Sequence, residues 1–512
     1  MIALTFLLEL VPLQEPSDGW KANYGFWIRV AAVTFVIAQP STGEAVYFIE
    51  SFNISAYQLT SLSGGIAVMF TACAIVISAN TVFPIPFFIL VLTPIYNIIH
   101  IVLFRVILGA QMLRQILAQR KQLIQYMHFL HAQIMMVFVY PIYEVLFHFV
   151  EGSKYQIPVI LLLPLIKVII KNIVLRCTMH VEDQTPEMVI FTVDFFNAIY
   201  LATCMQSATS PITISVIIIT DLSQTIVMVY GIHRRTHCIL SMIRDSIPGI
   251  AVKDNLLTTM CIMCRNQSIL GWQTGYNINI FSSFPHRISP EDDIFLKTLR
   301  TTDLPQAVVP APTILDIPSR ENCVEPSQLC LICTRNRRNN IYPDVLVLSD
   351  NAKEKRTHDK SKAAHCSLSE QPSILRYSLE TLFTTESLVV TSYLETIIPI
   401  IYATYIMAMA HLPNAHFHSE MQGVTQANAV STILPLLVFG LLQIVSFVLL
   451  VAVVKRNCGM ELFCQLAFVL ETHMWSIMSK LMVWMMITLC FRVVHFGTSP
   501  LLGSLCFILQ SS

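Results

Sequence analysis

Long runs of apolar residues constrain the fold of this chain more than any motif in it. A helix that crosses a lipid bilayer needs about 20 mostly apolar residues, and nine segments meet that requirement. A tenth segment, 25–49, is also apolar but contains Arg29 and a Gln-Pro pair at 39–40. The nine segments are 57–78, 82–104, 128–149, 157–174, 187–205, 212–231, 388–410, 431–454 and 464–491.

The composition is that of a membrane protein rather than a soluble one. Hydrophobic residues make up 54% of the 512 residues and charged residues 12%, whereas an ordinary globular domain has roughly 25% charged residues. We therefore predict an all-α polytopic transmembrane bundle of nine or ten helices with a long, largely disordered cytoplasmic loop. The expected parts are an N-terminal tail at 1–24, a transmembrane block at 25–231, the loop at 232–387, a second transmembrane block at 388–491 and a C-terminal tail at 492–512.

The basic residues of the loops predict the orientation of the helices. The connection after the second apolar segment contains Arg105, Arg114, Arg120 and Lys121 with no acid, and such loops are retained on the cytoplasmic side. Placing this connection inside also places 232–387 inside. The connections that fall outside, at 79–81, 206–211 and 411–430, contain no Lys or Arg, and the last of these is expected to be solvated.

Several functional classes have no support in the sequence. The formal net charge is zero, which gives no indication of a nucleic-acid partner. The chain lacks the phosphate-binding loop, nucleophile-elbow and zinc-protease motifs, so we predict neither an enzyme nor a cofactor. The first residues lack the basic stretch of a secretory signal, and a cleaved signal is not expected.

Two acidic residues in neighbouring apolar segments form the best-defined candidate site. Asp194 is followed three residues later by Asn197, and Asp221 by Gln224, so each acid shares a helical face with an amide. Counted from the 206–211 turn, the two acids lie at similar depth. If they face each other, one carboxyl would hold a proton, as in a proton or cation site. In the structural alternative, each acid pairs with Lys167, Lys171 or Lys480 and fixes the order of the helices.

Further ionisable residues occur in the last three apolar segments. Glu395 precedes Pro399, and a proline kink can open a cavity, which makes Glu395 a third proton or cation candidate. In the last segment, His473, Ser476 and Lys480 share one face of a helix while Glu471 points away from it. Polar contacts of this kind usually hold helices together.

The cysteines give at most a weak indication of a metal site. Two Cys-x-x-Cys pairs fall in the predicted loop, and two such pairs could supply a tetrahedral zinc site. Their separation exceeds that of ordinary zinc ribbons, so we expect free, reduced thiols. The four residues are Cys261, Cys264, Cys330 and Cys333.

Six stretches resemble a known group of sequences. The resemblance covers both apolar blocks, roughly 25–235 and 378–497, and is weakest in the loop. The stretches are LLLPLIKVIIKNIVLRCTMHVEDQTPE, VDFFNAIYLATCMQSA, ITDLSQTIVMVYGIHRR, LFTTESLVVTSYLETIIP, KRNCGMELFCQLAFVLETHM and LCFRVVHFG. They are similar to an expanded family of uncharacterised multi-pass membrane proteins encoded in oomycete genomes such as those of Phytophthora. The family has no assigned activity, so the resemblance implies no site residue, but it implies that 25–49 belongs to the membrane region.

Together these features predict an integral, multi-pass membrane protein that moves a small solute or ion by means of its intramembrane carboxylates. The alternative is a receptor or sensor that signals through its loop. The expected partners are membrane lipid, the small solute or ion, and a cytoplasmic protein for the loop. A water-accessible cavity that reaches Asp221 would favour transport, whereas an Asp221 bonded only to lysine or backbone in a closed core would favour a structural role.

Overall fold

The computed structural model describes most of the two apolar blocks and little of the segment between them. The predicted loop at 232–387 lies mostly outside the described residues. The described residues are 2–49, 52–86, 88–150, 153, 155–178, 185–208, 210–246, 255–265, 374–490 and 492–496.

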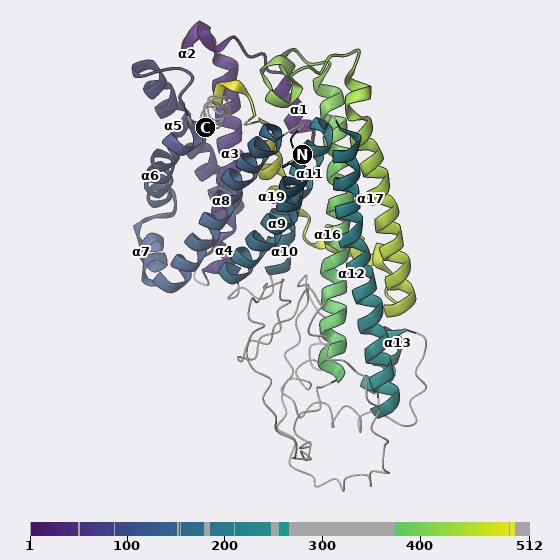
Figure 1. Cartoon of the computed structure of the whole chain (residues 1–512). Helices are drawn as coiled ribbons and strands as arrows, with labels where there is room; N and C mark the ends of the chain where they lie inside the picture. Colours follow the sequence, from purple (N-terminus) through teal and green to yellow (C-terminus); the bar gives the residue numbers. More distant parts are fainter. Residues whose placement is uncertain are drawn as a thin grey trace, which may run out of the picture. The chain divides into compact units, whose positions relative to one another are not determined.

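The described part of the chain is built from helices (Figure 1), as the all-α prediction requires. The pairing of His418 with Val493 is an isolated bridge outside any strand. The helices of the N-terminal half are α1 (Ile2–Leu10), α2 (Gly19–Ala22), α3 (Tyr24–Gly43), α4 (Ala45–Phe48), α5 (Ala56–Asn80), α6 (Phe88–Leu108), α7 (Ala110–Ala118), α8 (Arg120–Phe149), α9 (Gln156–Thr178), α10 (Thr185–Val189), the π-helical η3 (Ile190–Asp194), α11 (Phe195–Ser207) and α12 (Pro211–Ser246).

The C-terminal half continues in the same way. Its helices are α13 (Leu256–Arg265), α16 (Ile374–Met409), α17 (Ala429–Cys458), α18 (Leu462–Thr472), α19 (Met474–Met485) and the π-helical η6 (Met486–Cys490). Single turns of 3₁₀-helix occur at η1 (Pro16–Asp18), η4 (Pro413–Phe417), η5 (Ser419–Met421) and η7 (Val494–Phe496).

Eight helical segments of the described residues are long and apolar enough to cross a membrane. They correspond to the first eight of the nine predicted segments, so the chain is a multi-pass membrane protein by the length and composition of its helices. The eight are Ala56–Asn80, Val91–Leu108, Arg120–Phe149, Gln156–Thr178, Thr185–Ser207, Pro211–Arg244, Tyr377–Met409 and Ala429–Cys458.

Two predicted segments differ from a single spanning helix. The segment 464–491 is divided at His473 into α18 and α19, which are shorter apolar helices. The segment 25–49 becomes α3 and α4, with Pro40 inside α3. Proline has no N–H to donate and disturbs the turn before it, yet α3 continues past Pro40 to Gly43.

The described ends of the 232–387 segment are helical. The helix α12 runs on to Ser246, and α16 already begins at Ile374. Each of these helices has 36 residues, or about 54 Å at 1.5 Å per residue. They are therefore longer than the hydrocarbon core of a bilayer, which is about 30 Å thick.

The chain divides into two compact units. The first comprises Met1–Gln224, Val389–Leu449 and Gln465–Ser512, and the second comprises Thr225–Leu388 and Leu450–Cys464. The ionisable residues Lys167, Lys171, Asp194, Asp221 and Glu395 all belong to the first unit. In the second unit, Thr236 and Cys458 lie side by side with 3.7 Å between Oγ1 and Sγ.

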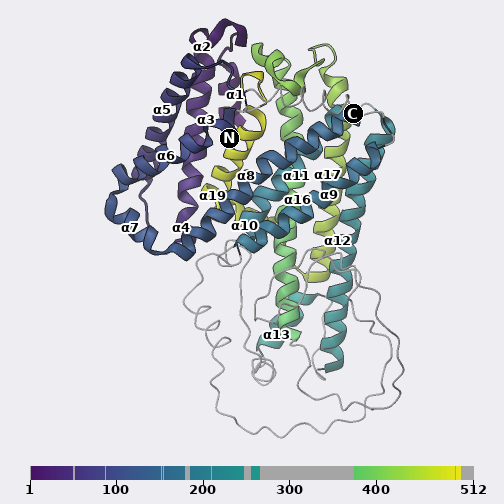
Figure 2. The ribbon, with the colours of Figure 1, turned by 60° about the vertical axis from the view of Figure 1, so that its left-hand side comes forward.

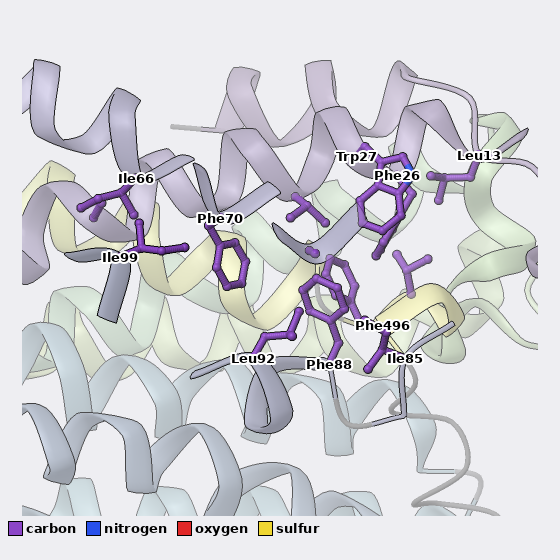
Figure 3. Close-up of a cluster of buried hydrophobic side chains, with 14 of the residues drawn as sticks. Leu13, Phe26, Trp27, Ile66, Phe70, Ile85, Phe88, Leu92, Ile99 and Phe496 are labelled. Atoms are coloured by element: carbon purple, nitrogen blue, oxygen red, sulfur yellow. The ribbon is translucent and has the colours of Figure 1, made fainter. Parts of the chain in front are cut away.

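Within the first unit, α3 packs against α5, α5 against α6, and α8 against α9 and α11 (Figure 2). The aromatic side chains of a buried cluster join α3 and α6 to the C-terminal 3₁₀ turn (Figure 3). Phe26 lies at its centre, with ring centroids 5.7 Å from Phe88 and 5.0 Å from Phe496. Such aromatic contacts add to the energy of area burial, and they bring the two ends of the described chain together.

The segment Thr185–Ser207 lies at the centre of the first unit. In its most apolar stretch 94% of the residues are buried, compared with 28% for α9. A central helix has no lipid-facing surface on which to place a polar group. Polar side chains of this segment must therefore find partners on neighbouring helices.

Candidate functional site

A group of ionisable side chains from α9, η3, α12 and α16 lies inside the first unit. We call Lys167, Lys171, Asp194, Asp221 and Glu395 the central ion cluster. Lys167 and Lys171 lie one helical turn apart on α9, so both ammonium groups project from the same face. The structure therefore brings residues of three apolar segments of the first block together with Glu395 from the second block.

Asp194 is the most enclosed member of the central ion cluster. Its carboxylate lies 3.3 Å from Lys167 Nζ and 3.5 Å from Lys171 Nζ, and its side chain is completely buried. Thr391 of α16 donates a hydrogen bond of 3.1 Å to Asp194 Oδ2. The two ion pairs are of the kind that the structural alternative predicted, and Asp194 Oδ1 has an ion-pair contact but no hydrogen-bond partner among the described residues.

Lys167 connects Asp194 to the other carboxyls. Its Nζ donates a hydrogen bond of 2.6 Å to Glu395 Oε1, and it also interacts electrostatically with Asp221. Charge-assisted hydrogen bonds of this length are among the strong ones in proteins. Lys167 thus interacts with all three acids of the cluster.

Asp221 has a different environment from Asp194. Gln443 of α17 donates a hydrogen bond of 2.5 Å from Nε2 to Asp221 Oδ2, and the charges of Glu395 and Lys167 act on the carboxyl. Gln443 is itself held in place, because Thr396 of α16 donates a hydrogen bond of 3.3 Å to its backbone carbonyl. Both acids interact with Lys167, which forms an ion pair with Asp194 and acts on Asp221 through its charge.

A small cavity of about 20 Å³ reaches Asp221. Asn197 and Gln224 line it together with Thr220 and Asp221. The two amides that follow Asp194 and Asp221 in the sequence therefore line one and the same cavity. One water molecule needs roughly 10–15 Å³ by a comparable measure. The cavity is therefore large enough for about one water molecule, and its wall supplies the polar partners that a water requires.

The backbone departs from α-helical geometry at this point. Residues Ile190–Asp194 form one turn of π-helix, and Asp194 is its last residue. Isolated π-helical turns occur frequently at functional sites. This turn lies on the side of Asp194 away from the 206–211 connection, so it changes the helical register of α10 relative to α11 and not the depth of Asp194 counted from that connection.

A second acid of the central segment, Glu187, gathers the polar residues of α19. Lys480 Nζ donates a hydrogen bond of 2.8 Å to Glu187 Oε1, Ser476 donates another, and His473 Nδ1 lies 3.3 Å from Oε2. The predicted common face of His473, Ser476 and Lys480 thus meets one carboxylate. Glu471 is exposed and takes part in none of the ion pairs described for these residues.

A closed group of charges joins α1 to α3 and to the 411–430 connection. Arg29 Nη1 lies 3.0 Å from Glu9 Oε1, and His418 Nε2 lies 3.0 Å from Glu9 Oε2, with all three side chains fully buried. Burial raises the pKa of the Glu9 carboxyl, but the hydrogen bond and charge of His418, with Arg29, lower it further, so that the pKa lies below its ordinary value. The expectation that the 411–430 connection is solvated is wrong at His418.

Cysteine and histidine residues of the described chain do not gather around a metal position. No group of three or more His, Cys, Asp or Glu residues within the described ranges is arranged to hold a metal ion. Cys261 is exposed and free. The side chain of Cys264, and all of Cys330 and Cys333, lie outside the described residues.

Gln443, Thr391 and Glu187 are the members of these sites that the sequence did not single out. Gln443 could have been found, because a buried amide near the middle of an otherwise apolar spanning segment is costly unless it has a partner. Thr391 gives no such signal, since threonine can donate to its own helix backbone. Glu187 stands at the beginning of its apolar segment, where an acid is ordinarily solvated.

Comparison with models of protein families, with curated proteins and with solved structures finds no match to this chain. The resemblance to the oomycete membrane proteins therefore stays a prediction, and the function of the sites is argued from their geometry.

Proposed function

We propose that this multi-pass membrane protein moves a proton, or a small solute together with a proton or small cation, and that Asp221 is the binding group. The observation that carries the proposal is the composition of the central ion cluster. Within the described residues it contains three carboxyls, Asp194, Asp221 and Glu395, but two ammonium groups, Lys167 and Lys171. One positive charge is needed to balance it.

The physical reason is the cost of excess charge in a medium of low dielectric constant. A charged side chain near the middle of a bilayer costs about 2.5–3.5 kcal/mol on insertion scales, and an uncompensated buried charge usually takes up a proton or a cation instead. Asp194 is fully buried between two lysines, whereas Asp221 lines a cavity with room for about one water. The balancing positive charge is therefore expected at Asp221.

Each residue of the cluster has a distinct role under this proposal. Asp221 accepts and releases the proton or cation, and Gln443 orients its carboxyl. Lys167 interacts with Asp194, Glu395 and Asp221, so a change of charge at Asp221 alters the balance of attractions on one ammonium group. Asp194, which also pairs with Lys171, holds Lys167 in place.

The test is ion flux into proteoliposomes that contain wild type or Asp221→Asn, under imposed gradients of pH, Na⁺ or K⁺. Asparagine has the shape of aspartate but neither accepts a proton nor carries a charge. We expect at least a tenfold loss of flux in Asp221→Asn, with an unfolding temperature within a few degrees of wild type. Glu471→Gln is the matched control, because Glu471 is an exposed acid outside the cluster.

Two outcomes would contradict the proposal. One is undiminished flux in a correctly folded Asp221→Asn protein. The other is a wild-type protein that transports none of the three ions while Asp221→Asn loses stability, which would make Asp221 a structural contact between α12 and α17.

A further inference from the structure

A second and much larger cavity, of about 480 Å³, lies within the first unit away from the central ion cluster. Its wall is formed mainly by α3, α6, α8 and α19 and is predominantly apolar. Cavities of about 300–1,000 Å³ with a mostly apolar wall and a few polar groups are typical of small-molecule sites. Residues that illustrate the apolar wall are Val33, Phe70, Phe104, Ile134, Trp484 and Phe496.

The polar groups of this cavity come from the end of α3 and the helices facing it. Thr42 Oγ1 and His100 Nε2 are 3.1 Å apart, and Tyr126 donates a hydrogen bond to the Ser41 carbonyl. The hydrogen-bonding capacity of these four groups is used by the contacts between them. Glu44, which also lines the cavity and is 5% exposed, has weaker support.

Among the described residues, the Glu44 carboxylate receives one hydrogen bond, of 3.3 Å, from Gln133 Nε2. A carboxylate offers about four acceptor positions, and a buried one is stable only when they are well used. Lys480 acts on Glu44 through its charge, but its hydrogen bond of 2.8 Å goes to Glu187. His473 likewise contacts Glu187.

The charges at this end of the cavity therefore leave a place for one more cation. Glu44 and Glu187 are two carboxyls beside one lysine, Lys480, whose hydrogen bond of 2.8 Å goes to Glu187, and His473 Nδ1 also contacts Glu187. A cationic group inside the cavity would complete the hydrogen bonding of Glu44 and balance its charge. The rest of the cavity wall would enclose an apolar body.

We propose that the 480 Å³ cavity binds an amphipathic amine, with the ammonium group at Glu44 and the apolar chain along α3, α6 and α8. An amphipathic carboxylate of the same length fits less well, because its head would face Glu44 with like charge. An alcohol of the same length lacks the charge but can still donate one hydrogen bond. This proposal does not depend on the function proposed for Asp221.

The test compares three probes with the same chain: dodecylamine, dodecanol and dodecanoate, each carrying bromine at the chain terminus. Trp484 lines the cavity, and bromine quenches tryptophan fluorescence on contact. Titration into nanodiscs of neutral lipid, corrected with protein-free discs, gives an apparent Kd for each probe. We expect saturable quenching by the amine at the lowest concentration, and loss of that component in Trp484→Phe.

Substitutions at Glu44 test the role of its charge. A hydrogen bond to a charged group contributes about 1.5–3 kcal/mol, so Glu44→Gln should weaken amine binding at least tenfold and leave dodecanol binding unchanged. Ala45 also lines the cavity, and Ala45→Phe should block all three probes. Glu461→Gln, at an exposed acid in the second unit, should behave as wild type.

The proposal is overturned if amine and carboxylate probes bind wild type equally, or if the amine loses nothing in Glu44→Gln. It is also overturned if Trp484→Phe leaves the saturable quenching intact. If Glu44→Gln folds poorly, Glu44→Asp serves as the second variant. It keeps the carboxylate charge but shortens the side chain by one methylene. We then expect amine binding to weaken by a smaller factor, and unchanged amine binding in that variant likewise counts against the proposal.

Discussion

The central ion cluster and the closed group of Glu9, Arg29 and His418 use the same chemistry in two different ways. In the closed group every side chain is 0% exposed and one acid faces two basic residues. In the central cluster Lys167, Glu395 and Lys171 keep 15%, 21% and 28% of their side-chain surface, and the acids outnumber the lysines.

The difference shows what separates a structural contact from a candidate ion site in a helix bundle. Both groups satisfy the rule that buried charges are paired. What distinguishes the central cluster is an excess of acids over basic residues beside a cavity large enough for about one water. We therefore expect substitutions in the closed group to change stability, and substitutions around Asp221 to change flux.

The largest effect is expected from Arg29→Met. Removing one partner of a fully buried ion pair leaves the other charge uncompensated and costs about 3–5 kcal/mol. The unfolding temperature in detergent should fall strongly, and any protein that still folds should keep its flux. A stable Arg29→Met protein with greatly reduced flux would remove the distinction between the two groups.

Acid should weaken the C-terminal turn that packs beside the closed group. Burial lowers the pKa of His495 to about 4, below an unfolded value near 6.5. The unfolded state then binds more protons between these values, so stability is full above pH 6.5 and decreases as the pH falls toward 4. The shift corresponds to about 3 kcal/mol at most.

His495→Gln provides the control for this pH dependence. The glutamine amide can still donate to the Gln14 carbonyl, which His495 contacts at 2.7 Å, but it does not titrate. Unfolding temperatures measured from pH 7.5 to pH 4.5 should decrease less in the variant than in wild type. Parallel curves would show that His495 is not responsible for the loss of stability in this pH range, because the lowered pKa of Glu9 places its own titration below pH 4.5.

A smaller effect on stability, with a clear effect on flux, is expected from Gln443→Leu. The substitution removes the hydrogen bond to Asp221, and hydrogen bonds to charged groups contribute about 1.5–3 kcal/mol. Because Asp221 then loses its orientation, flux should fall about tenfold. Gln422→Leu, at an exposed glutamine, is the matched control; equal flux in both variants would separate Gln443 from the site.

The smallest effect is expected at the exposed pair of Lys455 and Glu461. Their atoms are 2.9 Å apart, but both side chains are more than 60% exposed, and such pairs contribute about 0–1 kcal/mol. Lys455→Ala should therefore leave both the unfolding temperature and the flux near wild type. A larger loss of stability or flux would show that the contribution of an ion pair in this chain does not increase with its burial.

The apolar runs predicted most of the fold, because a spanning helix must satisfy its backbone internally and show lipid a continuous apolar surface. They did not predict the division at His473, where the side chains on both sides remain apolar. The site was predicted in part: Asp194, Asp221 and Glu395 stand out as charges in apolar helices. Their partners do not follow from such a pattern, since which helix faces Asp221 is decided by tertiary packing.

The position of Asp221 in α12 has an electrical consequence. The residue lies about halfway along the apolar part of the helix, so under the proposed function an ion that reaches it from one side crosses roughly half of the transmembrane voltage. One elementary charge gains about 2.3 kcal/mol per 100 mV across the whole membrane, and half of that changes occupancy about sevenfold. Binding at Asp221 would then report the membrane potential as well as the ion concentration.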